Sequence, residues 1–368
     1  MSKVTKALRD IFLCGQTNID KNIDCDGEYS FNSRNSSIQN DYDISINKQI
    51  YKTLENEGYT IIRRISNTLQ GCIFIAKYNK DNKKVIIKLG NKHMCKNGYT
   101  TVNGKMVKIS ENIKKEASIM KYLTHSSKNY PNHVLRFIKS KRFFSDINCY
   151  YLIQQYGGID MFTFVLDKHA MIRNNETLIQ HWKNSVKKYF CEIVNTLYWF
   201  HDVMSMCHLD ISLENMVYNA FKDRVYICDF GLSQVFKNSD TRNTDTQDCN
   251  RFLCDKYVGK YNYQCPKMVH KMPYDARKAD IWAFGVSLFL MNFGMQPFRS
   301  ASVHDPYYCN FMNGYLKLMI KDYGMESYLD ESLHDLLYKI FTSEEQRYKI
   351  KDIMKHEYTK GYEFSEFR

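Results

Sequence analysis

Residues 208–215 read HLDISLEN, and the triplet Asp229, Phe230 and Gly231 follows fourteen residues after Asn215. A surface aspartate or a turn asparagine is common on its own and needs no special explanation. The joint spacing of these residues is not common, and it decides the interpretation of the whole chain. Four further charged residues lie in order around this stretch: Lys88, Glu116, Asp280 and Arg347.

The size and composition of the chain limit the class of protein. Its 368 residues, 44% of them hydrophobic, suffice for a catalytic module of two lobes with a modest extension. No apolar run approaches the roughly 18 residues of a membrane helix. The N-terminal MSKVTKALRDIFLCG lacks a long apolar core, a small-residue cleavage site and a glycine after Met1. We therefore expect no membrane anchor.

Cysteine usage and net charge indicate the compartment and the partners. Twelve cysteines occur without a close CxxC pair, which argues against a zinc module, and a disulfide framework would need a secreted chain. We expect reduced thiols in the cytoplasm or the nucleus. The net charge of +12 permits attraction to acidic proteins, nucleic acid or anionic lipid. The alternative source of this charge is the mutational bias of an AT-rich genome, and we expect no DNA or RNA partner.

Polar residues dominate the stretch 1–50, so we expect it to be a largely disordered extension, although 3–13 could form a short amphipathic helix. From residue 59 the pattern changes to strands, beginning an antiparallel sheet. The predicted strands read YTIIRRI (59–65), CIFIAKY (72–78), KKVIIKL (83–89), VLRFIKS (134–140) and CYYLIQQY (149–156).

Between the third and fourth strands, the pairs Asn97-Gly98 and Asn103-Gly104 favour tight turns, which predicts an inserted hairpin over about 90–108. A helix follows, in which apolar residues fall on one face: Ile113, Ala117, Met120 and Leu123. The pair Gly157-Gly158 is typical of a flexible connection. Long helices are predicted over 177–203 and 278–294, the second buried because it is apolar nearly all round.

The HLDISLEN stretch and the Asp229 triplet resemble the protein kinase superfamily, and the match runs from about residue 59 to residue 358. The resemblance implies an α+β fold of two lobes, with an N-lobe over 51–156 and a mainly helical C-lobe over 157–368. It also implies transfer of the ATP γ-phosphate, with Mg²⁺, to serine or threonine hydroxyls of protein substrates. Asp210 would be the base, and Asn215 and Asp229 would hold the metal ions.

The same resemblance assigns the nucleotide contacts. Lys88 matches the lysine that binds the α- and β-phosphates, and Glu116 its ion-pair partner, although Glu111 is a competitor. In place of the usual GxGxxG, residues 66–71 read SNTLQG, so Ser66, Thr68 and Gly71 would cover the phosphates with a stiffer loop. Further along, Gln154 would stand at the back of the adenine pocket. The remaining expected ATP contacts are Gln155, Gly157 and Asp160.

A second departure from the family concerns Ser212 and Lys260. Ser/Thr kinases usually carry a lysine two residues after the base and a threonine before the APE-like triplet, whereas here the two positions hold Ser212 and Lys260. We expect Lys260 to reach the γ-phosphate while Ser212 supplies the hydroxyl contact to Asp210. The alternative is a solvated loop lysine beside an unrelated serine.

Two further replacements affect regulation and stability. Leu209 replaces the arginine that often holds a phosphorylated activation loop, so we expect activity without such phosphorylation; the usual phosphosite falls near Lys256. Lys267 replaces the glutamate that pairs with a buried arginine, matched here by Arg347. Two cations cannot stably share a buried site, so either Glu344 or Glu345 intercedes or the local architecture differs.

Two alternative functions come from other classes. A pseudokinase that binds nucleotide or partners without turnover is favoured by the changed glycine loop and by Lys267, and opposed by Lys88, Asp210, Asn215 and Asp229. A small-molecule phosphotransferase would lack Phe230-Gly231 and the DxWxxG helix at Asp280. We expect protein substrates and a monomer, and the composition with the exchanged pair resembles orphan kinases of apicomplexan parasites.

Overall fold

The computed structural model describes residues 19–23, 29–33, 42–102, 105–130, 135–172, 175–236, 252–365 and 367. The chain divides into two compact units. Unit 1 comprises residues 1–117 and 139–156, and unit 2 comprises residues 118–138 and 157–368. None of the helices in these described ranges is both long and apolar enough to cross a membrane.

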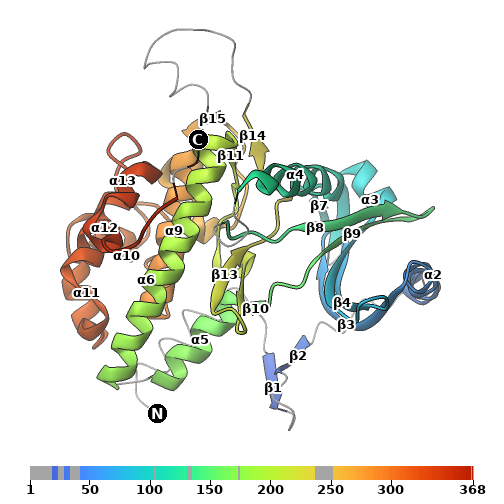
Figure 1. Cartoon of the computed structure of the whole chain (residues 1–368). Helices are drawn as coiled ribbons and strands as arrows, with labels where there is room; N and C mark the ends of the chain where they lie inside the picture. Colours follow the sequence, from blue (N-terminus) through green and yellow to red (C-terminus); the bar gives the residue numbers. More distant parts are fainter. Residues whose placement is uncertain are drawn as a thin grey trace. The chain divides into compact units, whose positions relative to one another are not determined.

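Unit 1 is built on a five-stranded antiparallel sheet in the order β3-β4-β5-β9-β8 (Figure 1). Its strands are β3 (Tyr59–Thr68), β4 (Gly71–Tyr78), β5 (Lys84–Asn91), β8 (Ser140–Ser145) and β9 (Cys149–Gln155). Four of them coincide with the strands predicted at 59–65, 72–78, 83–89 and 149–156. The strands β4 and β9 bury consecutive apolar residues, 74–76 and 151–153, whereas most of β3 is not buried.

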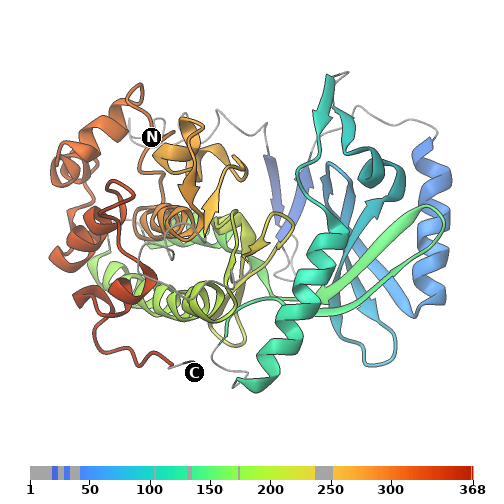
Figure 2. The same cartoon turned by 90° about the horizontal axis from the view of Figure 1, so that it is seen from above.

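The helix α2 (Tyr42–Asn56) covers the β3–β4 side of this sheet (Figures 1 and 2). Ile50 and Leu54, four residues apart and so on one face of the helix, join Phe74, Val85 and Ile87 in one buried cluster. The composition did not predict α2, because most residues of the stretch 1–50 are polar and only Ile50 and Leu54 of the helix join the buried cluster. In the same N-terminal stretch, β1 (Ile19–Ile23) and β2 (Tyr29–Ser33) pair antiparallel, while residues 3–13 lie outside the described residues.

The insertion contains a helix as well as a hairpin. Strands β6 (Tyr99–Val102) and β7 (Lys105–Lys108) pair antiparallel, and the residues that join them, 103–104, are outside the described ranges. Asn97-Gly98 does not form the predicted hairpin turn. Instead, Gly98 ends helix α3 (Lys92–Asn97) in the left-handed conformation, with φ +72°, because a residue without Cβ adopts it at no steric cost.

Unit 2 is mainly helical, and with the sheet of unit 1 it confirms the predicted α+β class. The long helices α6 (Glu176–Tyr198) and α9 (Ala276–Phe293) lie side by side (Figures 1 and 2), with Phe190 stacked on Phe284 at 4.7 Å between ring centroids. As predicted, α9 is buried along nearly its whole length. The other helices are α5 (Met161–Ile172), α8 (Pro266–Val269), α10 (Pro306–Met312), α11 (Leu316–Asp322), α12 (Glu331–Ile340) and α13 (Ile350–Met354).

Short antiparallel strands connect the helices of unit 2. They form three small sheets: β10 (Ile159–Asp160) with β12 (Met216–Asn219) and β13 (Arg224–Ile227), β11 (Met206–Cys207) with β14 (Gln234–Val235), and β15 (Leu253–Cys254) with β16 (Tyr274–Asp275). Short helical turns complete the unit: η1 (Ser127–Asn129), η2 (Trp199–Val203), η3 (Leu213–Asn215), η4 (Tyr261–Tyr263), η5 (Glu326–Tyr328) and η6 (Glu357–Thr359).

The helix α4 (Ile113–Ser126) buries the four apolar residues that the sequence places on one face. The strand predicted at 134–140 is wrong, because β8 begins only at Ser140. Arg136 and Phe137 belong to unit 2 instead. There the Arg136 guanidinium lies 3.2 Å from the Glu192 carboxylate, and Phe137 stacks on Trp199, so both side chains are buried within unit 2.

Candidate active site

Asp280 on α9 holds the stretch 208–215 in place through its backbone. One carboxylate oxygen accepts hydrogen bonds from the amide of His208, at 2.8 Å, and from the ring of His201, at 2.9 Å; the other accepts from the amide of Leu209 at 2.8 Å. Leu209, whose amide is held by Asp280, adopts a positive φ of 65°. Asp280 therefore binds the backbone of this loop at His208 and Leu209.

The carboxylate of Asp210 is oriented by groups from two segments. Asn215 donates from Nδ2 to Oδ2 of Asp210, at 2.6 Å, and to its backbone oxygen, at 2.8 Å. The backbone amide of Lys260 donates to Oδ1 at 3.2 Å. Because its amide nitrogen is used in this way, Asn215 keeps its Oδ1 oxygen for another partner.

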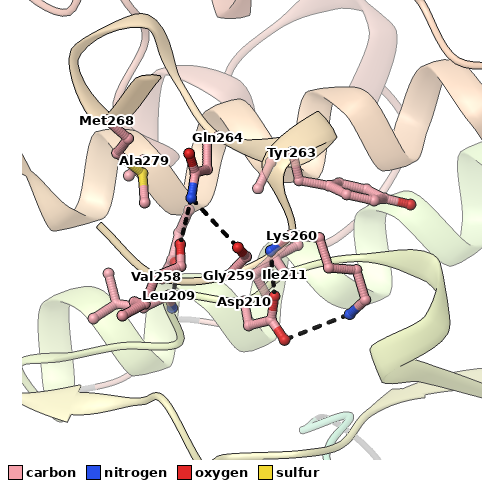
Figure 3. Close-up of a pocket in the computed structure, with 12 residues that line it drawn as sticks. Leu209, Asp210, Ile211, Val258, Gly259, Lys260, Tyr263, Gln264, Met268 and Ala279 are labelled. Carbon is pink, nitrogen blue, oxygen red and sulfur yellow. Dashed lines mark hydrogen bonds and ion pairs between the residues drawn. The ribbon is translucent and has the colours of Figure 1, made fainter. Parts of the chain in front are cut away.

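Lys260 and Ser212 lie together beside Asp210. The Lys260 ammonium is 2.8 Å from Ser212 Oγ and 3.4 Å from Asp210 Oδ2 (Figure 3 draws the contact with Asp210). Ser212 is 0% exposed, so its hydroxyl faces the interior and not the solvent. Lys260 thus contacts both side chains, whereas no hydrogen bond among the described residues joins Ser212 to Asp210, so the expected hydroxyl contact to the base is wrong.

The residue before Lys260 explains why Lys260 comes so close to Asp210 (Figure 3 labels all three residues). Gly259 has a φ of +81°, and a Cβ there would lie 2.8 Å from the Leu209 carbonyl oxygen, so only glycine allows this approach. Gln264 donates from Nε2 to the carbonyls of Val258, at 3.2 Å, and Gly259, at 3.3 Å. Sequence reasoning missed Gln264, although its place one residue before the Cys265 triplet could have drawn attention to it.

A hairpin explains the spacing of fourteen residues between Asn215 and Asp229. Strand β12 starts directly after Asn215, and β13 returns the chain so that the Cys228 amide donates to the Asn215 carbonyl at 2.9 Å. Asp229 follows with a positive φ of 63°, and its Oδ1 accepts from the Gly231 amide at 3.3 Å. The carboxylate and the amide oxygen are hard donors of the kind that Mg²⁺ prefers, so this pair fits the ion.

Phe230, which follows Asp229, and His208 are buried next to each other. Phe230 is fully buried and packs edge-on against Phe137, Phe200 and His208. Burial also lowers the pKa of His208, whose ring Nε2 donates to the Cys228 carbonyl at 3.1 Å. Because its pKa is lowered, the His208 ring is neutral at neutral pH and adds no positive charge to this buried region.

In unit 1, Lys88 and Glu116 form a buried ion pair. Lys88 on β5 is 3% exposed and Glu116 on α4 is 0% exposed, and their charged groups lie 2.8 Å apart. The competitor Glu111 is farther from the Lys88 ammonium, at 3.9 Å. Gln154 on β9 donates from Nε2 to Oε1 of Glu116 at 3.1 Å, a contact that the sequence did not indicate.

The predicted phosphate loop is a tight hairpin. β3 and β4 pair up to Thr68 and Gly71, with Ser66 opposite Ile73, so only Leu69 and Gln70 form the turn. A Cβ on Gly71 would lie 2.1 Å from the Leu89 carbonyl oxygen, so strand packing alone requires this glycine. The side chain of Gln70 is buried, and its Oε1 accepts from the Ile113 amide and from the Cys95 thiol, each at 3.3 Å.

The other expected ATP contacts have structural partners of their own. Gln155 ends β9 and donates its amide hydrogen to the Lys139 carbonyl at 3.1 Å. Asp160 accepts from the Phe162 amide and the Thr163 hydroxyl at the start of α5, and burial raises its pKa. The pair Gly157-Gly158 is explained by packing, because Cβ atoms there would lie 2.3 Å from the Val217 side chain and 1.8 Å from the Tyr218 oxygen.

Lys267 and Arg347 do not compete for one carboxylate. The Lys267 ammonium lies 2.8 Å from Glu344 and 3.1 Å from Glu345, so both glutamates pair with this lysine, where one was expected. The Arg347 guanidinium donates to the carbonyls of Ile340, Lys278 and Thr342, and it lies 4.8 Å from the centre of the Trp282 ring. Backbone oxygens and a π face thus satisfy the buried arginine.

Comparison with known proteins agrees with this geometry. The family described as "Protein kinase domain" matches residues 59–359. The chain is 22% identical to human testis-specific serine/threonine-protein kinase 4 over 258 residues, or 69% of this chain and 70% of that protein. It is 28% identical to Arabidopsis thaliana CBL-interacting serine/threonine-protein kinase 15 over 64% of this chain and 47% of that protein. It is 31% identical to rat SNF-related serine/threonine-protein kinase over 41% of this chain and 18% of that protein.

The family match covers most of the chain, whereas these alignments span less than half of the second and third relatives. The resemblance to apicomplexan kinases stays a prediction. On the family match, the chain belongs to the protein kinase domain family.

Proposed function

We propose that the chain is an active serine/threonine protein kinase that transfers the γ-phosphate of ATP to protein hydroxyls. The observation that carries the proposal is the contact of Lys260 with Ser212, at 2.8 Å, and with Asp210, at 3.4 Å. This contact supplies a cation and a hydroxyl beside the base Asp210. Lys260 stands where the family has a threonine, and Ser212 stands where the family has a lysine. A chain that had lost its activity would not need to keep this pairing.

Asp210 accepts the proton of the substrate hydroxyl as that oxygen bonds to the γ-phosphorus. The bond from the γ-phosphorus to the bridging oxygen breaks at the same time, and ADP leaves with the electron pair. The Lys260 ammonium neutralises charge on the transferred phosphoryl group, Asn215 holds Asp210 in position, and Ser212 holds the ammonium beside it. Oxygen atoms of Asn215 and Asp229 would hold Mg²⁺, which supplies further neutralisation of phosphate charge.

The proposed ATP contacts follow the family resemblance residue by residue. Lys88, held by Glu116, binds the α- and β-phosphates, and the hairpin residues Ser66, Thr68 and Gly71 cover the phosphates. Gln155 and Gly157 present backbone groups to the adenine. Asp160 binds the ribose.

Activity should not depend on phosphorylation of the activation loop. Leu209, where many kinases have an arginine, is buried, and Lys256, near the usual phosphosite, donates to the Gln234 side chain at 3.0 Å. A phosphate on the activation loop would therefore find no arginine at position 209 to bind, and the site near Lys256 already holds a positive charge. Modification of Thr241, Thr244 or Thr246 for another purpose stays a prediction, because these threonines lie outside the described residues. We further propose protein substrates, a monomeric state and a place in the cytoplasm or nucleus.

Intact-protein mass spectrometry after incubation with ATP, Mg²⁺ and a generic protein substrate tests the proposal. The wild type should add 80 Da increments, about the mass of one phosphoryl group, to itself or to the substrate, and the Asp229→Ala variant should add none. Phosphoamino-acid analysis should find phosphoserine and phosphothreonine. Mass increments that persist in Asp229→Ala would come from another enzyme and would remove the support for this site.

A pseudokinase is the second candidate, and one observation favours it. The hairpin over 66–71 is paired to its tip and its Gln70 is anchored in the interior, so it lacks the freedom that glycines give a phosphate loop. In that case a folded wild type would add no phosphate. Thermal shift with ATP would then separate a protein that binds nucleotide without turnover from one that does not bind it.

A further inference from the structure

A hollow lined by basic residues lies in unit 2 among η2, α9 and the start of α13. It has a volume of about 160 Å³, far above the about 10–15 Å³ that one water molecule needs. Its lining includes four basic side chains and one carboxylate: Arg277, Lys278, Lys349, Lys351 and Asp202. The other lining residues are His201, Ile281 and Ile350.

Lys278 is the residue that distinguishes this hollow from an ordinary charged surface. It is only 8% exposed, and its ammonium donates to the carbonyl oxygen of Arg347. An ammonium has three hydrogens, so two donors remain for other acceptors. Within the described residues Lys278 forms no ion pair, and burial with the nearby Arg347 cation lowers its pKa. A buried charge without a counter-ion is costly, which favours an anion beside it.

The carboxylates around the hollow are engaged elsewhere. Asp202 pairs with Lys351 at 3.1 Å, and Asp275 pairs with Arg277 at 3.0 Å while capping α9. Asp352 accepts from the Lys349 amide at 2.8 Å at the start of α13. Asp275 and Asp352 attract the Lys278 ammonium from a distance, but among the described residues neither forms an ion pair with it. Two of the lining lysines, Lys349 and Lys351, are exposed to solvent and so would attract an anion toward the hollow.

We propose that this hollow binds a phosphate group, with Lys278 as the buried donor and Lys349 and Lys351 as cations at its mouth. A phosphate dianion has several acceptor oxygens, so it can satisfy the remaining donors of Lys278 and one mouth lysine together. The proposal does not rest on the proposed function, because its residues are separate from Asp210, Asn215 and Asp229. The phosphate can belong to a free anion or to a phosphomonoester, and the two sources share the chemistry.

Nuclear magnetic resonance of lysine side-chain nitrogens tests the proposal on the full chain, labelled with ¹³C,¹⁵N-lysine. Inorganic phosphate is added at constant ionic strength, with chloride as the compensating anion. We expect a saturable shift of the Lys278 Nζ signal and an upward shift of its pKa, whereas Lys355, an exposed lysine at the end of α13, should not respond. An equal response to chloride, or no response at Lys278, would overturn the proposal.

Two variants separate binding from folding. Lys351→Met removes a cation at the exposed mouth, so folding should survive, and phosphate affinity should fall at least about tenfold. Lys355→Met is the matched control and should keep the wild-type affinity. Equal affinities in the two variants would show that phosphate binds elsewhere. A parallel titration with O-phosphoserine identifies the source of the phosphate group. A shift of the Lys278 signal with O-phosphoserine indicates a phosphorylated protein as the source. A shift with inorganic phosphate but not with O-phosphoserine indicates a free anion.

Discussion

The side-chain amide of Gln154 lies 3.1 Å from Oε1 of Glu116, whose other carboxylate oxygen is 2.8 Å from the Lys88 ammonium. The three residues come from β9, α4 and β5, and all are buried. Gln154 therefore acts as a positioning residue, because it fixes the carboxylate that holds the lysine proposed to bind phosphate. An apolar residue at this place would leave part of a buried carboxylate without its donor.

We predict that Gln154→Leu lowers the free energy of unfolding by about 1–3 kcal/mol and raises KM for ATP. Urea unfolding and steady-state kinetics measure the two effects. Gln180→Leu, at an exposed position on α6, is the control and should change neither. A loss of stability without a change in KM would show that Gln154 supports only the fold and does not position Lys88.

The contact between Lys260 and Ser212 leads to a prediction about an exchange. Lys260→Met should lower kcat by about 10²–10³-fold, because it removes the cation beside the base. Ser212→Lys with Lys260→Thr restores the usual family arrangement, so this double variant should be at least about tenfold faster than Lys260→Thr alone. Phosphate transfer to a protein substrate measures each rate, and a double-mutant cycle gives the coupling.

The single variant Ser212→Lys supplies the matched comparison. It places a second ammonium beside Lys260 at a position that is fully buried, so it should be less stable than the double variant. Unchanged turnover of Lys260→Met would contradict the role given to Lys260. Additive effects of the two changes would show that the contact has no catalytic meaning.

Local spacing predicted much of this fold, whereas contacts between distant segments escaped it. The face of α4 and the buried α9 follow from apolar periodicity, which a single segment reveals. The strand predicted over 134–140 was wrong, because the Arg136 pair with Glu192 depends on a residue far along the chain. Likewise, Asn97-Gly98 favours a turn in isolation, yet the preceding α3 makes Gly98 its C-terminal cap.

The candidate site shows the same limit. Motif spacing indicated Lys88, Asp210, Asn215 and Asp229, and the structure places the last three on one loop and hairpin. The sequence did not indicate Gln154 and Gln264 as positioning groups, because a single glutamine leaves no periodic pattern. The partner of Gln154, Glu116, lies 38 residues away, and Gln264 binds a backbone carbonyl, that of Val258.

The pairing of Lys267 with Glu344 predicts that restoring the family glutamate by itself is harmful. Lys267→Glu would place a third carboxylate beside Glu344 and Glu345, so we expect a loss of about 1–2 kcal/mol in the free energy of unfolding. Adding Glu344→Lys should recover most of that loss. Chemical unfolding measures both, with Lys360→Glu, which alters an exposed pair with Glu357, as a control that should differ little.

The burial of two histidines predicts how stability depends on pH. Burial lowers the pKa of His169 and of His208, so in the folded state both stay neutral at a pH where the unfolded chain takes up a proton. The unfolded state therefore binds more protons below about pH 6.5, and stability falls as the pH drops through that range. The fall should not exceed about 1.4 kcal/mol per pH unit for each histidine.

His169→Gln tests this dependence away from the candidate site. Its ring Nε2 donates to the Met291 carbonyl at 3.1 Å, and a glutamine amide can donate to that oxygen without taking up a proton. The variant should therefore lose less stability than the wild type between pH 7 and about pH 5, while His208 keeps part of the slope. Urea unfolding across this range gives both curves. Parallel curves would mean that His169 does not contribute to the slope, and a steeper curve in the variant would reverse the sign that burial requires.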